Sequence, residues 1–126
     1  MSHSHLGVTM KVFVYFNLHK KVFSIKSLEG DTKGLVIGHS RSVRLTNATF
    51  KVSEAGRQRV LKEKRKNVHA GVMGEWFNDP DNDRLILDGN EVTYNPYKFK
   101  SFVRKDTLEE IRTASEVQLI DKRIFI

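Results

Sequence analysis

The sequence contains no cysteine, only two prolines and no long apolar run. The absence of cysteine excludes disulfides, thiolate catalysis and zinc or iron–sulfur sites with Cys ligands. No segment approaches the roughly 20 apolar residues of a membrane-spanning helix, and the first residues lack the apolar stretch of a signal peptide. Glycine-rich phosphate-binding motifs, GxSxG and HExxH are also missing. These absences predict a cytoplasmic protein with no cofactor and no membrane partner.

What the chain does have is positive charge. Its 126 residues include 22 Lys and Arg against 15 Asp and Glu, which gives a net charge of +7. An excess of this kind attracts polyanions, nucleic acid first. The length predicts one domain at 10–126, which begins with the strand-like MKVFVYF. We expect residues 1–9, which contain His3 and His5, to be a disordered leader or an added extension.

Strands dominate the predicted fold, and one main helix interrupts them. Ser53 is a suitable N-cap, and Asn67 a suitable left-handed stop, for a basic helix that continues to about Lys66. The sequence TLEE at 107–110 matches a capping box and predicts a short helical turn. Alternation, β-branched residues and turn residues predict an antiparallel, β-rich α+β domain with strands at 11–16, 22–26, 35–39, 42–45, 49–52, 68–73, 85–87, 92–94, 97–103, 117–120 and 123–126.

Two pairs of similar segments suggest an internal repeat. FNLHKK at 16–21 resembles YNPYKFK at 94–100, and HSRSVRLTN at 39–47 resembles TASEVQLID at 113–121. Two β-meander units with the basic helix between them would explain both pairs. The alternative is that strands and turns look alike in any β-rich chain.

The densest charge lies in GRQRVLKEKRKN at 56–67. Like charges on one helix repel each other unless a partner such as a phosphate backbone neutralises them. A solvated helix face is the alternative. The sequence therefore predicts a nucleic-acid-binding surface formed by Arg57, Arg59, Lys62, Lys64, Arg65 and Lys66, with Lys20 from the first turn.

Histidines and a Tyr–Lys pair are the candidates for catalysis. His19 and His69 could divide general-acid and general-base work on a phosphodiester, with Tyr97 and Lys98 brought near by the second motif. Lysine would stabilise the charged transition state. This hypothesis describes a metal-independent ribonuclease or nuclease. The alternative is that each histidine is an ordinary surface or packed residue.

Metal chemistry has little support. Asp79, Asp81 and Asp83 mimic the start of a calcium loop, but Arg84 and Asn90 stand where the loop needs Gly and Glu. We therefore expect no metal site. A stacking platform for single strands is a further hypothesis, with core packing of Tyr97 and Phe99 as its alternative; its members are Trp76, Phe77, Tyr94, Tyr97, Phe99 and Phe102 among Lys98, Lys100 and Arg104.

The segments KVFVYFNLHKKVFSIKSLEG, VSEAGRQRVLKEKRKNVHAG and VTYNPYKFKSF resemble a family of small uncharacterised proteins of tailed bacteriophages and prophages. The resemblance covers most of the chain from Met10. It implies a role in the host bacterial cytoplasm, such as host takeover, counter-defence or nucleic-acid processing, and it assigns no functional residue. The leading expectation is a phage-type nucleic-acid-binding protein, with or without nuclease activity. The alternative is a non-enzymatic host-takeover or counter-defence protein that binds the acidic surface of a host protein.

Overall fold

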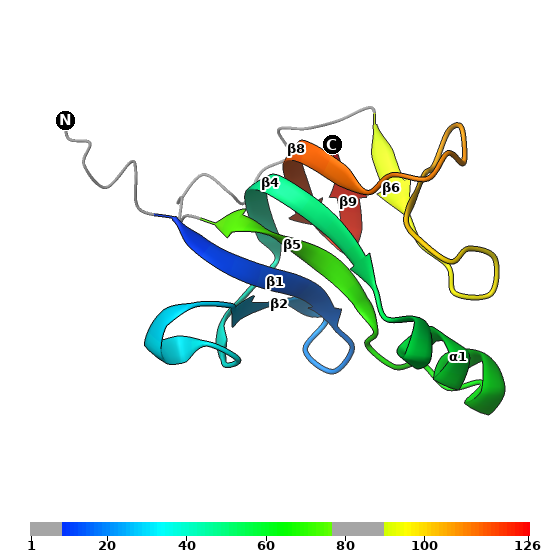
Figure 1. The fold of residues 1–126 in the computed structure, drawn as a ribbon, viewed down its shortest axis with the longest axis horizontal. Coiled ribbons are helices and arrows are strands. Elements are labelled where there is room, and N and C mark those ends of the chain that lie inside the picture. Colours follow the sequence, from blue (N-terminus) through cyan, green and yellow to red (C-terminus); the bar gives the residue numbers. More distant parts are fainter. Residues whose placement is uncertain (1–8, 77–89) are drawn as a thin grey trace.

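The computed structural model describes residues 9–76 and 90–126 (Figure 1). These residues form one antiparallel sheet of nine strands and one α-helix, so the predicted β-rich α+β fold is confirmed. Residues 1–8 of the expected leader and the predicted strand at 85–87 lie outside the described residues. Within the described part, no helix is long and apolar enough to cross a membrane.

The first half of the chain forms five strands and the helix. The first three strands follow one another as a meander, with a short 3₁₀ turn at Gly30–Thr32, and the last strand returns to pair with the first. The elements are β1 (Met10–Asn17), β2 (Val22–Ser27), β3 (Val36–Ser40), β4 (Ser42–Val52), α1 (Glu54–Glu63) and β5 (Ala70–Trp76).

The second half adds four strands to the free edge of β4. They are β6 (Glu91–Thr93), β7 (Val103–Arg104), β8 (Thr113–Ile120) and β9 (Arg123–Phe125). Strand β8 pairs with β4 along most of its length. The order across the sheet is therefore β3-β2-β1-β5-β4-β8-β9-β6-β7.

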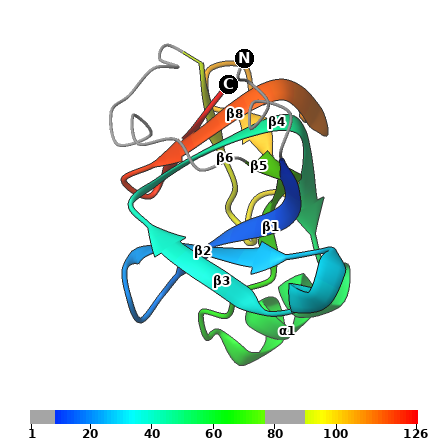
Figure 2. The same cartoon turned by 90° about the vertical axis from the view of Figure 1, so that its left-hand side faces the viewer.

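The sheet is strongly curled (Figure 2). Only Arg41 separates β3 from β4, although these strands are four places apart in the sheet. Four strand spacings in a flat sheet would span about 19 Å, whereas two residue steps reach at most about 7 Å. The curl encloses a core whose fully buried side chains include Val12, Val14, Val43, Leu45, Val72 and Val117.

The two halves share one strand order. The sequence β2-β1-β5-β4 in the first half reappears as β7-β6-β9-β8 in the second. Where the two halves meet, Val43 pairs with Leu119 and Leu45 pairs with Val117. A twofold relation between the halves, in which Val43 corresponds to Val117 and Leu45 to Leu119, would produce this crossed pairing. The similar segments at 16–21 and 94–100 thus occupy corresponding turns, after β1 and β6, and those at 39–47 and 113–121 lie mainly on the corresponding strands β4 and β8. The unit differs from a simple meander, because β5 returns beside β1, and α1 lies inside the first unit, between β4 and β5, instead of between the two units.

Three local predictions needed correction or refinement. Ser53 does cap α1, and its Oγ accepts a 3.1 Å hydrogen bond from the N–H of Gly56. The helix ends at Glu63 instead of Lys66, because Lys64 adopts a left-handed conformation (φ 56°). Residues 97–103 form mainly a turn, with only Val103 in a strand. Residues 107–110 form no helical turn, since Leu108 has a positive φ of 63°.

Candidate nucleic-acid interface

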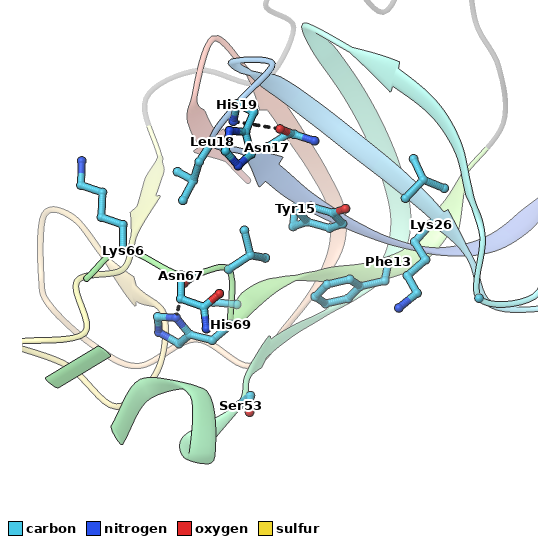
Figure 3. A pocket seen from close by; sticks show the side chains of 14 residues that line it. Phe13, Tyr15, Asn17, Leu18, His19, Lys26, Ser53, Lys66, Asn67 and His69 are labelled. Atoms are coloured by element: carbon cyan, nitrogen blue, oxygen red, sulfur yellow. Dashed lines mark hydrogen bonds between the residues drawn. The ribbon is translucent and has the colours of Figure 1, made fainter. Parts of the chain in front are cut away.

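A cavity of about 650 Å³ opens between the face of β1, the β1–β2 turn and the segment that follows α1 (Figure 3). We call it the first cavity. Figure 3 shows Phe13 and Tyr15 on one side of it and Asn67 and His69 on the other, with His19 at the turn. Its size lies in the range of ligand-binding pockets. Its lining is formed by Phe13, Tyr15, Asn17, Leu18, His19, Lys26, Gly34, Val36, Ser53, Lys66, Asn67, Val68, His69 and Ala70.

A second cavity, of about 470 Å³, adjoins the first. The two share Leu18 and the segment from Lys66 to Ala70. The remaining lining of the second cavity is mostly apolar and aromatic, and it comes from Phe16, Val60, Tyr94, Asn95, Pro96 and Tyr97. Neither lining contains an Asp or Glu among the described residues, so the surroundings favour an anionic ligand.

His69 stands between the two cavities, and both of its ring nitrogens are hydrogen-bonded. Nδ1 lies 2.8 Å from the carbonyl oxygen of Asn67, which can only accept, so Nδ1 carries a proton. Nε2 lies 2.7 Å from the hydroxyl of Tyr94, which donates to it when the ring is neutral. Burial raises the pKa of the Tyr94 hydroxyl above its usual value and keeps it protonated. The partner of His69 is therefore Tyr94, a residue that the sequence analysis did not assign to catalysis.

The β1–β2 turn carries His19 and Lys20, both exposed. The Asn17 side chain holds this turn, because its Oδ1 accepts from the N–H groups of His19 (3.0 Å) and Lys20 (2.9 Å). Its Nδ2 donates to Ser24 Oγ, which in turn lies 3.0 Å from Nδ1 of His39. This local role of Asn is the one expected from its preference for turns.

The corresponding turn at 95–99 is held by Asn95, whose Oδ1 accepts a 2.9 Å bond from the N–H of Tyr97. Tyr97 is 59% exposed and lines the second cavity, so the alternative that it packs in the core is wrong. Lys98 is exposed and lines neither cavity. Tyr97 therefore shares the second cavity with His69, whereas His19 lines only the first cavity.

Arg57 differs from the other cations of its segment. It is buried, and its Nε donates to the carbonyl oxygens of Pro96 (3.1 Å) and Phe99 (3.0 Å). Its Nη1 donates to Glu54 at 3.2 Å. The sequence analysis assigned Arg57 to nucleic acid, but its burial and its three bonds make it an anchor that ties α1 to the 95–99 turn.

The other cations of the segment are all exposed. They belong to the second half of α1 and to the residues after it, and this part of the chain lies at one end of the sheet (Figure 1). Lys66 alone among them lines both cavities. This exposed group, called the basic segment below, comprises Arg59, Lys62, Lys64, Arg65 and Lys66.

The structure corrects the aromatic platform expected from the sequence. Phe102 is 4% exposed and packs on Phe50, with ring centroids 5.1 Å apart, so it belongs to the core. Trp76 packs against the core, and Phe77 lies outside the described residues. The sequence analysis missed Phe13 and Tyr15, which line the first cavity. Their signal was available, because the strand KVFVYF is apolar on both faces, whereas an antiparallel strand with one solvated face alternates with polar residues.

The histidines assigned to catalysis line one cavity. His19 stands at the β1–β2 turn and His69 on the segment after α1 (Figure 3). No group of three His, Asp or Glu residues that could hold a metal ion occurs in the described ranges. Asp79, Asp81 and Asp83 lie outside those ranges.

Residues 5–126 match the model of a family described as the Mycobacterium phage L5 gene 82 protein. The gene 82 protein of Mycobacterium phage L5 is 40% identical over 121 residues, which cover 91% of this chain and 94% of that protein. No solved structure matches the chain.

Proposed function

The chain belongs to the family of the Mycobacterium phage L5 gene 82 protein, and from this premise we propose that it binds nucleic acid in the cytoplasm of the infected bacterium. The binding site is the first cavity together with the basic segment. The observation that carries the proposal is the lining of that cavity, which combines Lys26, Lys66 and two histidines with no acidic residue among the described ones.

The distribution of charge supports this assignment. The basic segment has five exposed cations, and Glu63 is the only acidic residue within it. Lys20 adds an exposed cation at the β1–β2 turn, next to His19, which lines the first cavity. A phosphate backbone neutralises such an arrangement and releases its counterions on binding. A solvated surface that serves only solubility does not need five cations within eight consecutive residues, because solubility is served as well by charges of both signs spread over the surface.

The test measures affinity as a function of salt with two matched double variants. Arg65→Ala/Lys66→Ala removes two cations of the basic segment. Lys105→Ala/Arg112→Ala removes two cations that line neither cavity. We expect affinity to fall steeply with salt for the wild type. The first double variant should reduce the slope of log affinity against log salt by about 1.4 on a single strand, which is two contacts at about 0.7 each. The control should change it little.

Two outcomes would overturn the proposal. An equal loss in both double variants would mean that only overall charge matters. A wild type that binds no oligonucleotide at low salt, while it binds an acidic host protein, would favour the other function, a host-takeover or counter-defence protein without enzymatic activity.

Cleavage of RNA is a second candidate function. It is favoured by one observation, that His19 and His69 line the same cavity. In that reaction one histidine would take the proton of the 2′-hydroxyl and the other would protonate the leaving oxygen. His69 could take part only if its Nε2 exchanged the hydroxyl of Tyr94 for the substrate.

A further inference from the structure

The outward face of β1 carries two aromatic rings side by side. Phe13 and Tyr15 are half-buried, and their ring centroids are 6.1 Å apart with planes tilted by 32°. Val12 and Val14 occupy the opposite face and are fully buried in the core. The two rings are therefore not part of the core cluster, and they lie on the wall of the first cavity.

The neighbouring strand is shaped to receive one of these rings. A Cβ on Gly71 would lie 2.5 Å from Cζ of Phe13 and 2.4 Å from the carbonyl oxygen of Val14. The absence of a Cβ at Gly71 thus leaves the space on β5 that the ring of Phe13 occupies. On the other side, Lys26 of β2 is the direct cross-strand neighbour of Phe13. The result is an aromatic surface with a cation beside it.

The residues around the two rings indicate which ligand chemistry fits this cavity. Lys26, Lys66, His19 and His69 line the same cavity as the two rings, with no Asp or Glu among the described lining residues. A purely apolar ligand would offer no opposite charge to Lys26 and Lys66. A ligand that alternates flat rings with negative charges would satisfy both sets.

We propose that Phe13 and Tyr15 stack on the bases of a single-stranded nucleic acid, while Lys26 and Lys66 contact its phosphates. This inference rests on the proposed function and narrows it from nucleic acid in general to unpaired strands. A duplex keeps the faces of its bases stacked inside the helix, so it can reach the cations but not the rings. Stacking is tolerant of sequence, because every base has a π-face.

The decisive experiment compares three fluorescent 12-mers with the wild-type protein: a single strand, the same strand with abasic sites, and the corresponding duplex. The abasic strand keeps every phosphate and loses the rings. We expect it to bind roughly 5- to 100-fold more weakly for each stacked base that is lost. The measurement is made with DNA and with RNA, since both offer the same chemistry. It uses no variant, so it does not depend on how a mutant folds.

Variants then show which aromatic side chains stack on the bases. Tyr15→Leu and Phe13→Leu keep an apolar side chain on the strand and remove the ring, and each should weaken single-strand binding roughly 5- to 100-fold. Tyr15→Phe keeps the ring and should stay within about twofold of the wild type, a change far below that range. Tyr97→Leu removes an exposed ring from the second cavity and should have the smaller effect.

The possible failures are distinguishable. Equal affinity for the abasic and the intact strand would overturn the stacking proposal, and if Arg65→Ala/Lys66→Ala still lost affinity, the proposed function would stand. Loss on Tyr97→Leu without loss on Tyr15→Leu would also overturn it, because the bases would then occupy the second cavity. Absence of binding to all three 12-mers would contradict the proposed function itself.

Discussion

The hydroxyl of Tyr94 lies 2.7 Å from Nε2 of His69, and the two rings are in edge contact with centroids 5.4 Å apart. The opposite nitrogen of His69 is held by the carbonyl of Asn67. The backbone of His69 is fixed as well, because its carbonyl accepts a 2.7 Å bond from the N–H of Ser53, the residue that caps α1. His69 therefore lines both cavities and is hydrogen-bonded to Ser53 at the start of α1 and to Tyr94, the residue after β6.

Removal of the Tyr94 hydroxyl tests this connection. Tyr94→Phe leaves Nε2 of His69 without its donor, so we expect a loss of about 1 kcal/mol in the free energy of unfolding. Because the pKa of Tyr94 is raised in the folded protein, its contribution is complete below the usual pKa of 10.0 and declines as the pH rises through the folded value. Urea unfolding at pH 8 and above pH 10 should show the difference from wild type shrinking. A constant difference would contradict the role of burial at this hydroxyl.

Arg57 and Arg59 should separate stability from binding. Arg57→Ala removes three hydrogen bonds and leaves the carbonyls of Pro96 and Phe99 without their donor, so we expect a loss of about 2–3 kcal/mol in stability. Arg59→Ala removes an exposed cation and should change stability by less than about 0.5 kcal/mol while it weakens nucleic-acid binding. Thermal unfolding and binding assays on the pair check this. Equal stability of the two variants would contradict the anchoring role of Arg57.

Replacement of Gly56 by alanine should not give the increase in stability that alanine usually gives in a helix. Alanine is favoured over glycine in helices by about 1 kcal/mol, but a Cβ at this position would lie 2.5 Å from Cβ of His69. Overpacking of this kind costs about 1–3 kcal/mol, so Gly56→Ala should destabilise the protein or displace His69. Gly38→Ala in strand β3 is the control for an added Cβ without a clash, because its nearest described atom, in Ile25, would be at an ordinary 3.7 Å. Unfolding midpoints compare the two, and a stabilised Gly56→Ala would show that the contact yields easily.

The ion pair between Glu91 and Arg123 predicts a pH dependence in the acid range. Hydrogen bonds of 2.6 and 3.1 Å from Arg123 hold the pKa of the Glu91 carboxyl below its usual value. Its contribution to stability is therefore present at neutral pH and is lost as the pH falls through the lowered pKa. Glu91→Gln should be less stable than wild type at pH 7 and equal to it in strong acid. Glu109→Gln, which removes a carboxylate with no ion pair among the described residues, serves as the control in urea unfolding at both pH values.

If the protein cleaves RNA, cleavage should persist in EDTA, since no metal-binding cluster occurs in the described residues. A histidine pair should give a bell-shaped dependence of rate on pH. His19→Ala or His69→Ala should then lower the rate by roughly 10²- to 10⁴-fold, with a much smaller effect on binding. Tyr94→Phe distinguishes a catalytic His69 from a structural one, because it frees Nε2 and should alter the pH profile as well as the rate. Purified protein that binds RNA and never cleaves it would end this candidate function, and cleavage only with added metal would implicate Asp79, Asp81 and Asp83.

Features that depend on neighbouring residues could be predicted from the sequence. The Ser53 cap and the turns held by Asn17 and Asn95 are examples, since each side chain bonds backbone within three residues. The strands predicted at 42–45 and 49–52 were in the right place, but they form one strand, β4. Asn47, with φ 50°, lies in an irregularity of the pairing with β5. Because turns and bulges favour the same residues, the sequence predicted a turn at this bulge and divided the strand in two.

The identity of the partners in the site could not be predicted, because it depends on residues far apart in the chain. Arg57 and Arg59 look alike in the sequence, and only the carbonyls of the 95–99 turn make one of them an anchor. Tyr94 and Tyr97 are three residues apart in the sequence. Tyr94 is half-buried against His69, whereas Tyr97, in the turn held by Asn95, is exposed.

The two halves of the sheet connect their corresponding last two strands in different ways. Asp121 and Lys122, both with positive φ, are enough to connect β8 to β9, whereas the corresponding connection from β4 to β5 holds α1 and the basic segment. The two-residue connection between β8 and β9 shows that the pairing of these strands does not require a long connection. In evolutionary terms, the connection between β4 and β5 is a place where a phage lineage could lengthen, shorten or change the charge of the basic segment while every strand keeps its partners.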